Sequence, residues 1–201
     1  MKKIAIAVAL MMLVQVASGQ AAYEKSIELA GGPALNSHTQ YSVGANTTHG
    51  ILSNNFFIGA GVGFRYTSAL YYSSYRSYYQ FGSLQTETYK SYDGKYLVPV
   101  YIRASYRFGR ASVKPMLSFD VGATFDVGKN QKYKNTEGLF YEPAVGVNIS
   151  LDDNTSMFIT VGLNYQNAHH TYYTMSYYDG TSTEEIKGMA STLHFRIGFT
   201  F

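Results

Sequence analysis

Apolar and polar residues alternate along the segment 189–201, which reads MASTLHFRIGFTF. From Leu193 to Phe201 every second residue is apolar, and the residues between them are mostly polar. Because successive side chains of a β-strand point to opposite faces, this pattern predicts a strand with one apolar and one polar face. An apolar strand with an unpaired edge promotes aggregation, so we expect this strand to pair with the first one and close a barrel.

Seven earlier segments show the same alternation, which predicts an all-β protein. The segment 56–67 is the most regular, and its glycines at alternate positions leave room for large side chains from neighbouring strands. The segment 40–52 is the least regular, because Thr47 and His49 fall on its nominally apolar face. The predicted strands are 25–32, 40–52, 56–67, 96–108, 112–127, 139–151, 156–166 and 189–201.

Connections between the predicted strands alternate in length. Those after the second, fourth and sixth strands have about three to four residues, whereas the others are longer. This asymmetry is typical of membrane barrels, which have short periplasmic turns and longer extracellular loops. We therefore predict a closed eight-stranded antiparallel up-and-down transmembrane barrel with both termini on the periplasmic side. The two longest loops are predicted at 68–95 and 167–187.

The N-terminal segment 1–21 has the pattern of a secretory signal peptide. Lys2 and Lys3 precede an apolar stretch at 4–16, and small residues follow it. The apolar stretch is shorter than the ~20 residues that a transmembrane helix needs. A buried N-terminal helix is the alternative interpretation. We predict cleavage within residues 19–22 and a barrel domain over 22–201.

Composition removes several classes of function. The chain of 201 residues has no Cys and no Trp but 20 Tyr, 12 Phe and 19 Gly. Without cysteine there are no disulfides, thiolate metal ligands or cysteine nucleophiles, so closure of the sheet is the expected source of stability. The formal charge of +3 includes the two lysines of the predicted signal peptide. The mature protein is therefore close to neutral, and no nucleic-acid partner is expected.

The signal peptide, the paired alternating strands and the terminal HFRIGFTF resemble the small eight-stranded outer-membrane barrels of the OmpA/OmpX type. The resemblance extends over nearly all of the mature chain, but only to the barrel half of OmpA. It implies a location in the outer membrane of a Gram-negative bacterium, with outer-membrane lipid and the barrel insertion machinery as partners. It also implies that Phe199 and Phe201 form the membrane insertion signal.

Charged residues of both signs fall on the polar, inward face of the predicted strands. An eight-stranded barrel is just wide enough for side chains to fill, so a wide pore is not expected. Unpaired charges there would be costly, and mixed signs allow pairing. A structural salt-bridge network is one interpretation, and a gated proton or ion path is the other. The predicted interior charge network is Glu28, Arg65, Arg103, Arg107, Lys114, Asp120, Asp126, Glu142 and Arg196, with His194 on the same face.

Enzymatic candidates are weak. Outer-membrane acylases that act on lipid A use a Ser-His-acid arrangement on the lipid-facing wall, and here His49 with Ser42 or Ser53 is the corresponding candidate. No acidic residue lies nearby on the same outward face, so we predict no catalysis and no cofactor. The adjacent His169 and His170 are weak metal ligands, because neighbours in a strand point opposite ways.

The two predicted long loops combine repeated Tyr with Ser, Thr and Gly. Tyr gives rigid contact area and Ser gives adaptable hydrogen bonding, as in antibody binding sites. We therefore predict a structural or adhesive role with an extracellular protein or glycan as the bound partner. The alternative is that these tyrosines extend the strands and form the interfacial aromatic belt. The candidate binding residues are Tyr71, Tyr72, Tyr75, Tyr78, Tyr79, Tyr172, Tyr173, Tyr177 and Tyr178.

A secreted or periplasmic barrel of the lipocalin type, carrying an apolar ligand, is the alternative architecture. It requires the apolar faces of the strands to point inward and the polar faces to meet water. The inward face would then contain nearly every oily residue, and the glycine-rich face with few charges would be the soluble surface. This distribution argues against it.

Overall fold

The computed structural model describes residues 21–35, 41–68, 71–80, 83–92, 95–127, 137–176 and 180–201. Residues 1–20, which contain most of the predicted signal peptide, lie outside this set. For residues 71–80, 83–92, 95, 137, 168–176, 180–188 and 190 only the backbone is described. In the described part of the chain, no helix is long and apolar enough to cross a membrane.

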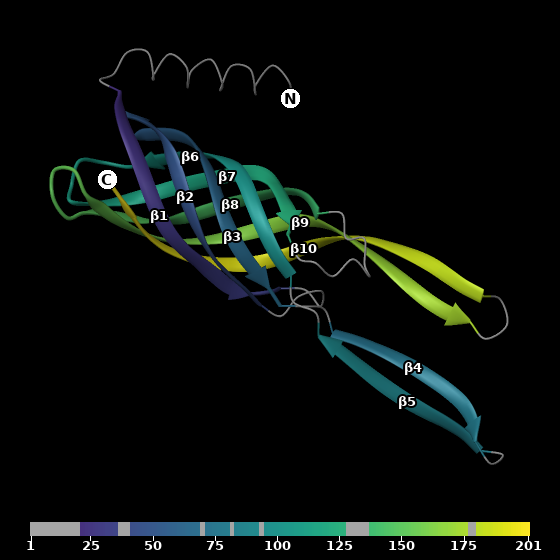
Figure 1. Cartoon of the computed structure of the whole chain (residues 1–201). Helices are drawn as coiled ribbons and strands as arrows, with labels where there is room; N and C mark the ends of the chain where they lie inside the picture. The colour runs from purple at the N-terminus through teal and green to yellow at the C-terminus, as the bar shows by residue number, and fades with distance from the viewer. Residues whose placement is uncertain are drawn as a thin grey trace.

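Eight antiparallel strands close into a barrel (Figure 1), which confirms the predicted fold. Their order around the barrel is β1-β10-β9-β8-β7-β6-β3-β2, so neighbours in sequence are neighbours in space apart from the closing pair β1 and β10. The strands are β1 (Ala22–Pro33), β2 (Tyr41–Ser53), β3 (Phe56–Thr67), β6 (Lys95–Arg107), β7 (Val113–Asp126), β8 (Glu137–Ser150), β9 (Ser156–Ser176) and β10 (Gly180–Thr200).

The first and last strands are hydrogen-bonded to one another. Lys25 and Phe201 exchange two backbone hydrogen bonds of 2.9 Å each, and the pairing continues with Ile27 opposite Phe199. Following paired residues from Lys25 around the barrel leads back to Leu35, ten residues farther along the chain. A stagger of this size in eight strands corresponds to a strand tilt of about 40°.

Both predicted long loops contain strands instead, and here the prediction is wrong. The segment 68–95 includes the two-stranded sheet of β4 (Tyr71–Gln80) and β5 (Ser83–Tyr92). β9 and β10 each have 21 residues and take up most of the segment 167–187. Tyr and Thr favour strands, but these segments are polar on both faces and so lack the alternation on which the prediction relied.

The short connections lie at the end of the barrel where the chain ends (Figure 1). Asn54 and Asn55 form the two-residue turn between β2 and β3, and their positive φ angles of 49° and 69° match the twist of a tight hairpin. Between β8 and β9, the Asp152 carboxylate accepts hydrogen bonds from the backbone N–H groups of Asn154 and Thr155, at 2.8 and 2.6 Å. This end carries the predicted short turns.

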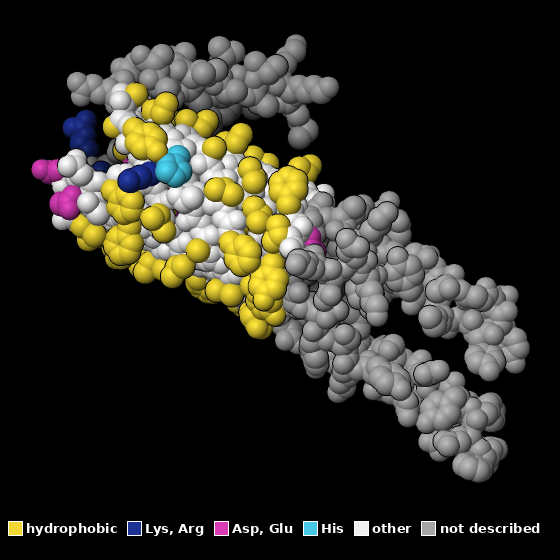
Figure 2. All heavy atoms as spheres, viewed as in Figure 1, with side chains coloured by type: hydrophobic (Ala, Val, Ile, Leu, Met, Phe, Trp, Pro, Cys, Tyr) yellow, Lys and Arg dark blue, Asp and Glu magenta, His cyan; other side chains and the backbone are white. Residues whose placement is uncertain are grey.

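Apolar side chains cover the outer wall of the barrel, and polar side chains fill the inside. In β1, Ile27 and Leu29 are 57% and 61% exposed, whereas Glu28 between them is 1% exposed. Figure 2 shows the apolar side chains spread over the visible wall. An apolar surface of this extent needs a lipid or protein partner, and the arrangement is the reverse of what the lipocalin alternative requires.

Candidate functional site: the charged barrel interior

Arg103 is the centre of the interior cluster. Its side chain projects from β6 and forms two hydrogen bonds with Glu28 on β1, at 2.6 and 2.8 Å. It forms two more with Asp120 on the neighbouring strand β7, both 2.8 Å long. A planar guanidinium that binds two carboxylates in this way makes strong, directional bonds. Arg103 therefore ties β6 to β7 and, across the lumen, to β1.

Arg196 extends the cluster from β10 to β8. Its guanidinium lies 2.9 Å from Asp120 and also binds Glu142, with Nε 2.7 Å from Oε1. The other oxygen of Glu142 accepts hydrogen bonds from Asn164 and His194, at 2.8 and 2.9 Å. Asp120 is thus shared between Arg103 and Arg196, and Glu142 is shared between Arg196 and the two donors Asn164 and His194.

Arg65 is held more loosely than the other two arginines. Its nearest carboxylate oxygen, on Glu142, is 4.0 Å away, and its guanidinium lies 5.7 Å from the centre of the Phe140 ring. With Arg65 included, three arginines face the three carboxylates Glu28, Asp120 and Glu142. Equal numbers of opposite charges keep the buried cluster close to neutral, which limits the cost of burying them.

A second, separate ion pair lies toward the short turns. Arg107, near the end of β6, forms hydrogen bonds of 2.8 and 2.5 Å with Glu24 on β1. Sequence reasoning missed Glu24 because the predicted strand began one residue later, at Lys25. Alternation extended backwards from Glu28 and Ser26 would have placed Glu24 on the inward face.

Large uncharged side chains occupy the lumen beside the charged cluster. The hydroxyl groups of Tyr101 and Thr48 lie 2.9 Å apart, and Phe140 packs edge-on against the Tyr101 ring at 6.2 Å. A Cβ atom on Gly61 would lie 2.3 Å from the Tyr101 ring, and one on Gly198 would lie 2.5 Å from the ring of Phe158. The predicted role of inward glycines, making room for large neighbours, is confirmed.

His194 connects Ser42 to the carboxylate of Glu142. Its Nε2 atom is 2.8 Å from the Ser42 hydroxyl, and its Nδ1 atom is 2.9 Å from Glu142 Oε2. The ionised carboxylate is an acceptor only, so Nδ1 carries a proton, and Nε2 of the neutral ring accepts the Ser42 O–H. This is the order of groups in a hydrolase triad. Ser42 is only 4% exposed, however, and Glu142 also binds Arg196. We therefore interpret this series of hydrogen bonds as part of the polar network that fills the barrel interior.

The weak enzymatic candidate, His49 with Ser42 or Ser53, is not assembled in the structure. His49 is exposed on the outer wall, while Ser42 and Ser53 are buried inside it. Strand alternation explains this separation, because residue 49 and residues of even number in β2 point to opposite faces, and Ser53 ends the strand at the turn. Among the described residues, no three His, Asp or Glu side chains are grouped as a metal site.

The other predicted charged residues lie nearer the rims. Lys114, the second residue of β7, is half-buried, and Asp126, the last residue of β7, is exposed rather than interior. β7 ends at Asp126, three residues beyond its last pairing with β8 at Ala123, so the side chain lies at the rim of the barrel. Phe199 and Phe201, the predicted insertion signal, are exposed on the outer wall.

Seven of the nine candidate loop tyrosines are in strands that the structure describes. Residues 71, 72, 75, 78 and 79 are in β4, and residues 172 and 173 are in β9, with backbone positions only. Tyr177 and Tyr178 lie outside the described residues. His169 and His170 are in the stretch of β9 known by its backbone alone.

Three solved structures of similar architecture are outer-membrane or surface proteins by name. Neisserial surface protein A superimposes with a TM-score of 0.54 at 13% identity, over 90% of this chain and 97% of that one. OprG from Pseudomonas aeruginosa gives 0.53 at 12% identity, over 91% and 98%. AlkL, solved in lipid bilayers, gives 0.50 at 12% identity, over 91% of both chains.

The fold is that of the small outer-membrane barrels. No protein-family model and no curated protein sequence matches the chain. At this level of identity the comparisons establish the architecture, and the predicted outer-membrane location agrees with all three neighbours.

Proposed function

We propose that this protein is a non-enzymatic outer-membrane barrel that anchors two surface hairpins, which bind an extracellular protein or glycan. The observation that carries the proposal is the length of β9 and β10. The last pairing of β9 with β8 is at Ala168, opposite Glu137, but β9 and β10 stay paired as far as Ser176 and Gly180. Eight residues of each strand therefore form a two-stranded extension (Figure 1) of about 25 Å.

The second hairpin, β4–β5, has an equally regular register. Its ten consecutive backbone pairs begin with Tyr71 opposite Tyr92 and include Arg76 opposite Glu87. Opposite charges at directly paired positions favour this register. Both hairpins are rich in Tyr, Ser and Thr, a composition that gives large contact areas with adaptable hydrogen bonding.

An aromatic belt already exists on the barrel wall below the hairpins. Tyr66 packs against Tyr96 with ring centres 5.3 Å apart, Phe64 stacks on Tyr96 at 5.7 Å, and Tyr141 stacks on Tyr165 at 5.0 Å. Aromatic side chains of this kind mark the interface between membrane and water. These residues lie in the barrel itself, where Tyr66 pairs with Tyr96 and Tyr141 with Tyr165. The hairpin tyrosines are therefore in excess of what the belt needs, which favours a binding role.

The interior supports an anchor rather than a conduit. Arg103, Arg196 and their carboxylates span the lumen, and Tyr101 and Phe140 fill space beside them. We take the salt-bridge network as structural. The alternative, a gated ion path, predicts that the protein conducts ions in planar bilayers.

Binding is tested with purified protein in lipid nanodiscs applied to a glycan array and to a panel of purified extracellular-matrix proteins. We expect at least one reproducible ligand, and we expect its binding to be lost when residues 71–92, residues 169–187 or both segments are replaced by short Gly-Ser linkers. A Tyr75→Ser/Tyr78→Ser variant tests the tyrosines of β4. Each linker variant must still be a closed barrel, which is shown by a change in its migration on a detergent gel after boiling. Binding that survives replacement of both segments, or an intact protein that binds nothing in either panel, contradicts the proposal.

A further inference from the structure

A lysine and a histidine interrupt the apolar outer wall of the barrel near its short-turn end. Lys25 on β1 and His49 on β2 are directly opposite one another in the register, and both are exposed. Among the outward strand residues whose side chains are described, these two carry the only basic or acidic groups, apart from Asp126 at the end of β7. Figure 2 shows a basic side chain beside a histidine within the apolar surface.

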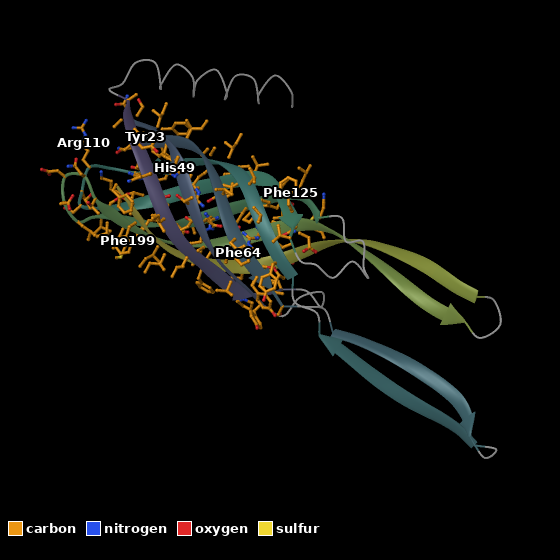
Figure 3. The ribbon with its side chains drawn as sticks, in the orientation of Figure 1. Tyr23, His49, Phe64, Arg110, Phe125 and Phe199 are labelled. Atoms are coloured by element: carbon orange, nitrogen blue, oxygen red, sulfur yellow. The ribbon has the colours of Figure 1, made fainter. Side chains whose placement is uncertain are left out.

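Hydrogen bonds organise the histidine. The Tyr23 hydroxyl lies 2.6 Å from His49 Nδ1, and the Thr47 hydroxyl lies 3.1 Å from His49 Nε2. Thr47 donates its own proton to the backbone oxygen of Ser26 at 3.0 Å, so its oxygen accepts the Nε2 proton of His49. Nδ1 of the neutral ring then accepts the Tyr23 proton. Figure 3 shows Tyr23 and His49 together on the outer wall.

This arrangement leaves one positive donor for a ligand, the ammonium group of Lys25. The Lys25 ammonium group lies 5.2 Å from the centre of the ring of Phe201, which directly follows β10. A ring of this kind is a weak partner that leaves the ammonium N–H groups available. His49 holds the Tyr23 hydroxyl in place, and this hydroxyl can turn its proton from Nδ1 to a ligand oxygen, so it supplies a second, neutral donor. A ligand with several anionic oxygens is the complement of these groups.

Depth in the membrane identifies the class of ligand. Lys25 shares backbone hydrogen bonds with Phe201 at the end of β10, and His49 is four residues before Ser53, where β2 ends. Both are therefore within about 10 Å of the short turns along the barrel axis. This is the headgroup layer of the periplasmic leaflet, where long basic side chains extend toward the polar region.

We propose that Lys25, His49 and Tyr23 form a binding site for the phosphate of a phospholipid headgroup on the outer wall of the barrel. The ammonium group of Lys25 supplies the charge. His49 orients the Tyr23 hydroxyl, which supplies a further donor. The apolar wall on the side away from the short turns, including Ile27 and Leu29, receives the acyl chains. The site is independent of the hairpins and of any binding by them.

The test is native mass spectrometry of the detergent-purified protein with added dioleoyl phosphatidylglycerol. Two control ligands are used: dioleoylglycerol, which has the acyl chains without the phosphate, and inorganic phosphate, which has no acyl chains. We expect retention of phosphatidylglycerol but of neither control ligand. Lys25→Met should weaken retention about fivefold, and Tyr23→Phe, which removes one hydroxyl, should weaken it less. Arg110→Met removes one exposed positive charge from the β6–β7 turn and should leave retention unchanged.

Each alternative outcome contradicts the site. Equal losses in Lys25→Met and Arg110→Met would show that total charge governs binding. Equal retention of dioleoylglycerol would show that the acyl chains suffice, and binding of inorganic phosphate alone would show an anion site without lipid preference. If Lys25→Met does not fold, as judged by the heat-dependent gel shift, Tyr23→Phe decides the question, because unchanged retention in that variant contradicts the proposal.

Discussion

The Arg103 guanidinium lies 2.6 Å from the Glu28 carboxylate, although 75 residues separate the two in the chain. β6 and β1 are not neighbours in the sheet, so this ion pair crosses the lumen. A single bidentate contact thus joins opposite walls of the barrel and places a charged bridge where a channel would have to run.

Replacing Arg103 with Met should destabilise the barrel by about 3–5 kcal/mol, because Glu28 and Asp120 would both remain buried without their main partner. The measurement is the free energy of unfolding in urea after refolding into detergent micelles. Arg110→Met, at an exposed turn, is the control and should be near neutral. Unchanged unfolding of Arg103→Met together with new conductance in planar bilayers would favour the gated ion path over a structural network.

Replacing Gly61 with Ala should destabilise the barrel by about 1–3 kcal/mol, because the added methyl group overlaps the Tyr101 ring. Ala60→Val, at the next position but on the exposed wall, is the matched control for added volume in β3. In a Gly61→Ala/Tyr101→Leu double variant the two effects should be less than additive, since the smaller side chain relieves the overlap. If the losses of unfolding free energy of the two single variants are strictly additive in the double variant, the Tyr101 ring does not lie against residue 61.

The turn between β8 and β9 should stabilise the protein in a pH-dependent way. Hydrogen bonds from the backbone N–H groups of Asn154 and Thr155 lower the pKa of Asp152 from its usual 3.8. A lowered pKa in the folded state means that this contribution is fully present above pH 3.8, and it disappears as the pH falls through the folded-state value.

Asp152→Ala should therefore lower the urea midpoint at pH 7, and its difference from the unchanged protein should shrink well below pH 3.8. Asp153→Ala, at the neighbouring exposed position, controls for loss of a surface carboxylate and should show a smaller effect. If Asp152→Ala lowers the urea midpoint by the same amount at every pH, the effect comes from the conformational entropy of the turn and not from the ionised carboxylate.

Ser42 should not react with a fluorophosphonate probe in the folded protein, even though its hydroxyl bonds to His194. Its burial and the engagement of Glu142 by Arg196 are the reasons. The measurement is probe labelling before and after urea unfolding, with Ser42→Ala as the control for site assignment. Labelling of folded protein that disappears in Ser42→Ala would reveal an activated serine and an enzymatic role.

Alternation along the chain was sufficient to predict the barrel and the inward position of residues such as Glu28 and Arg103. It does not reveal which of them meet, because contacts across the lumen depend on the stagger of the strands, which emerges only when the sheet closes. The contact of Ser42 with His194 has the same origin, as 152 residues separate them. The β4–β5 hairpin is not predicted for a different reason, since Tyr, Ser and Thr occur at both odd and even positions of its strands and give no apolar period to detect.

The seam between β1 and β10 sets the order of events during biogenesis. Lys25 lies in the first strand of the barrel and its hydrogen-bonding partner is Phe201, directly after the last strand, so the ribosome must deliver both strands before the ring can be completed. Until then, the open sheet presents two unsatisfied edges. A chain cut short by premature termination would lack its last strand, remain open, and be left to chaperones and proteases in the periplasm.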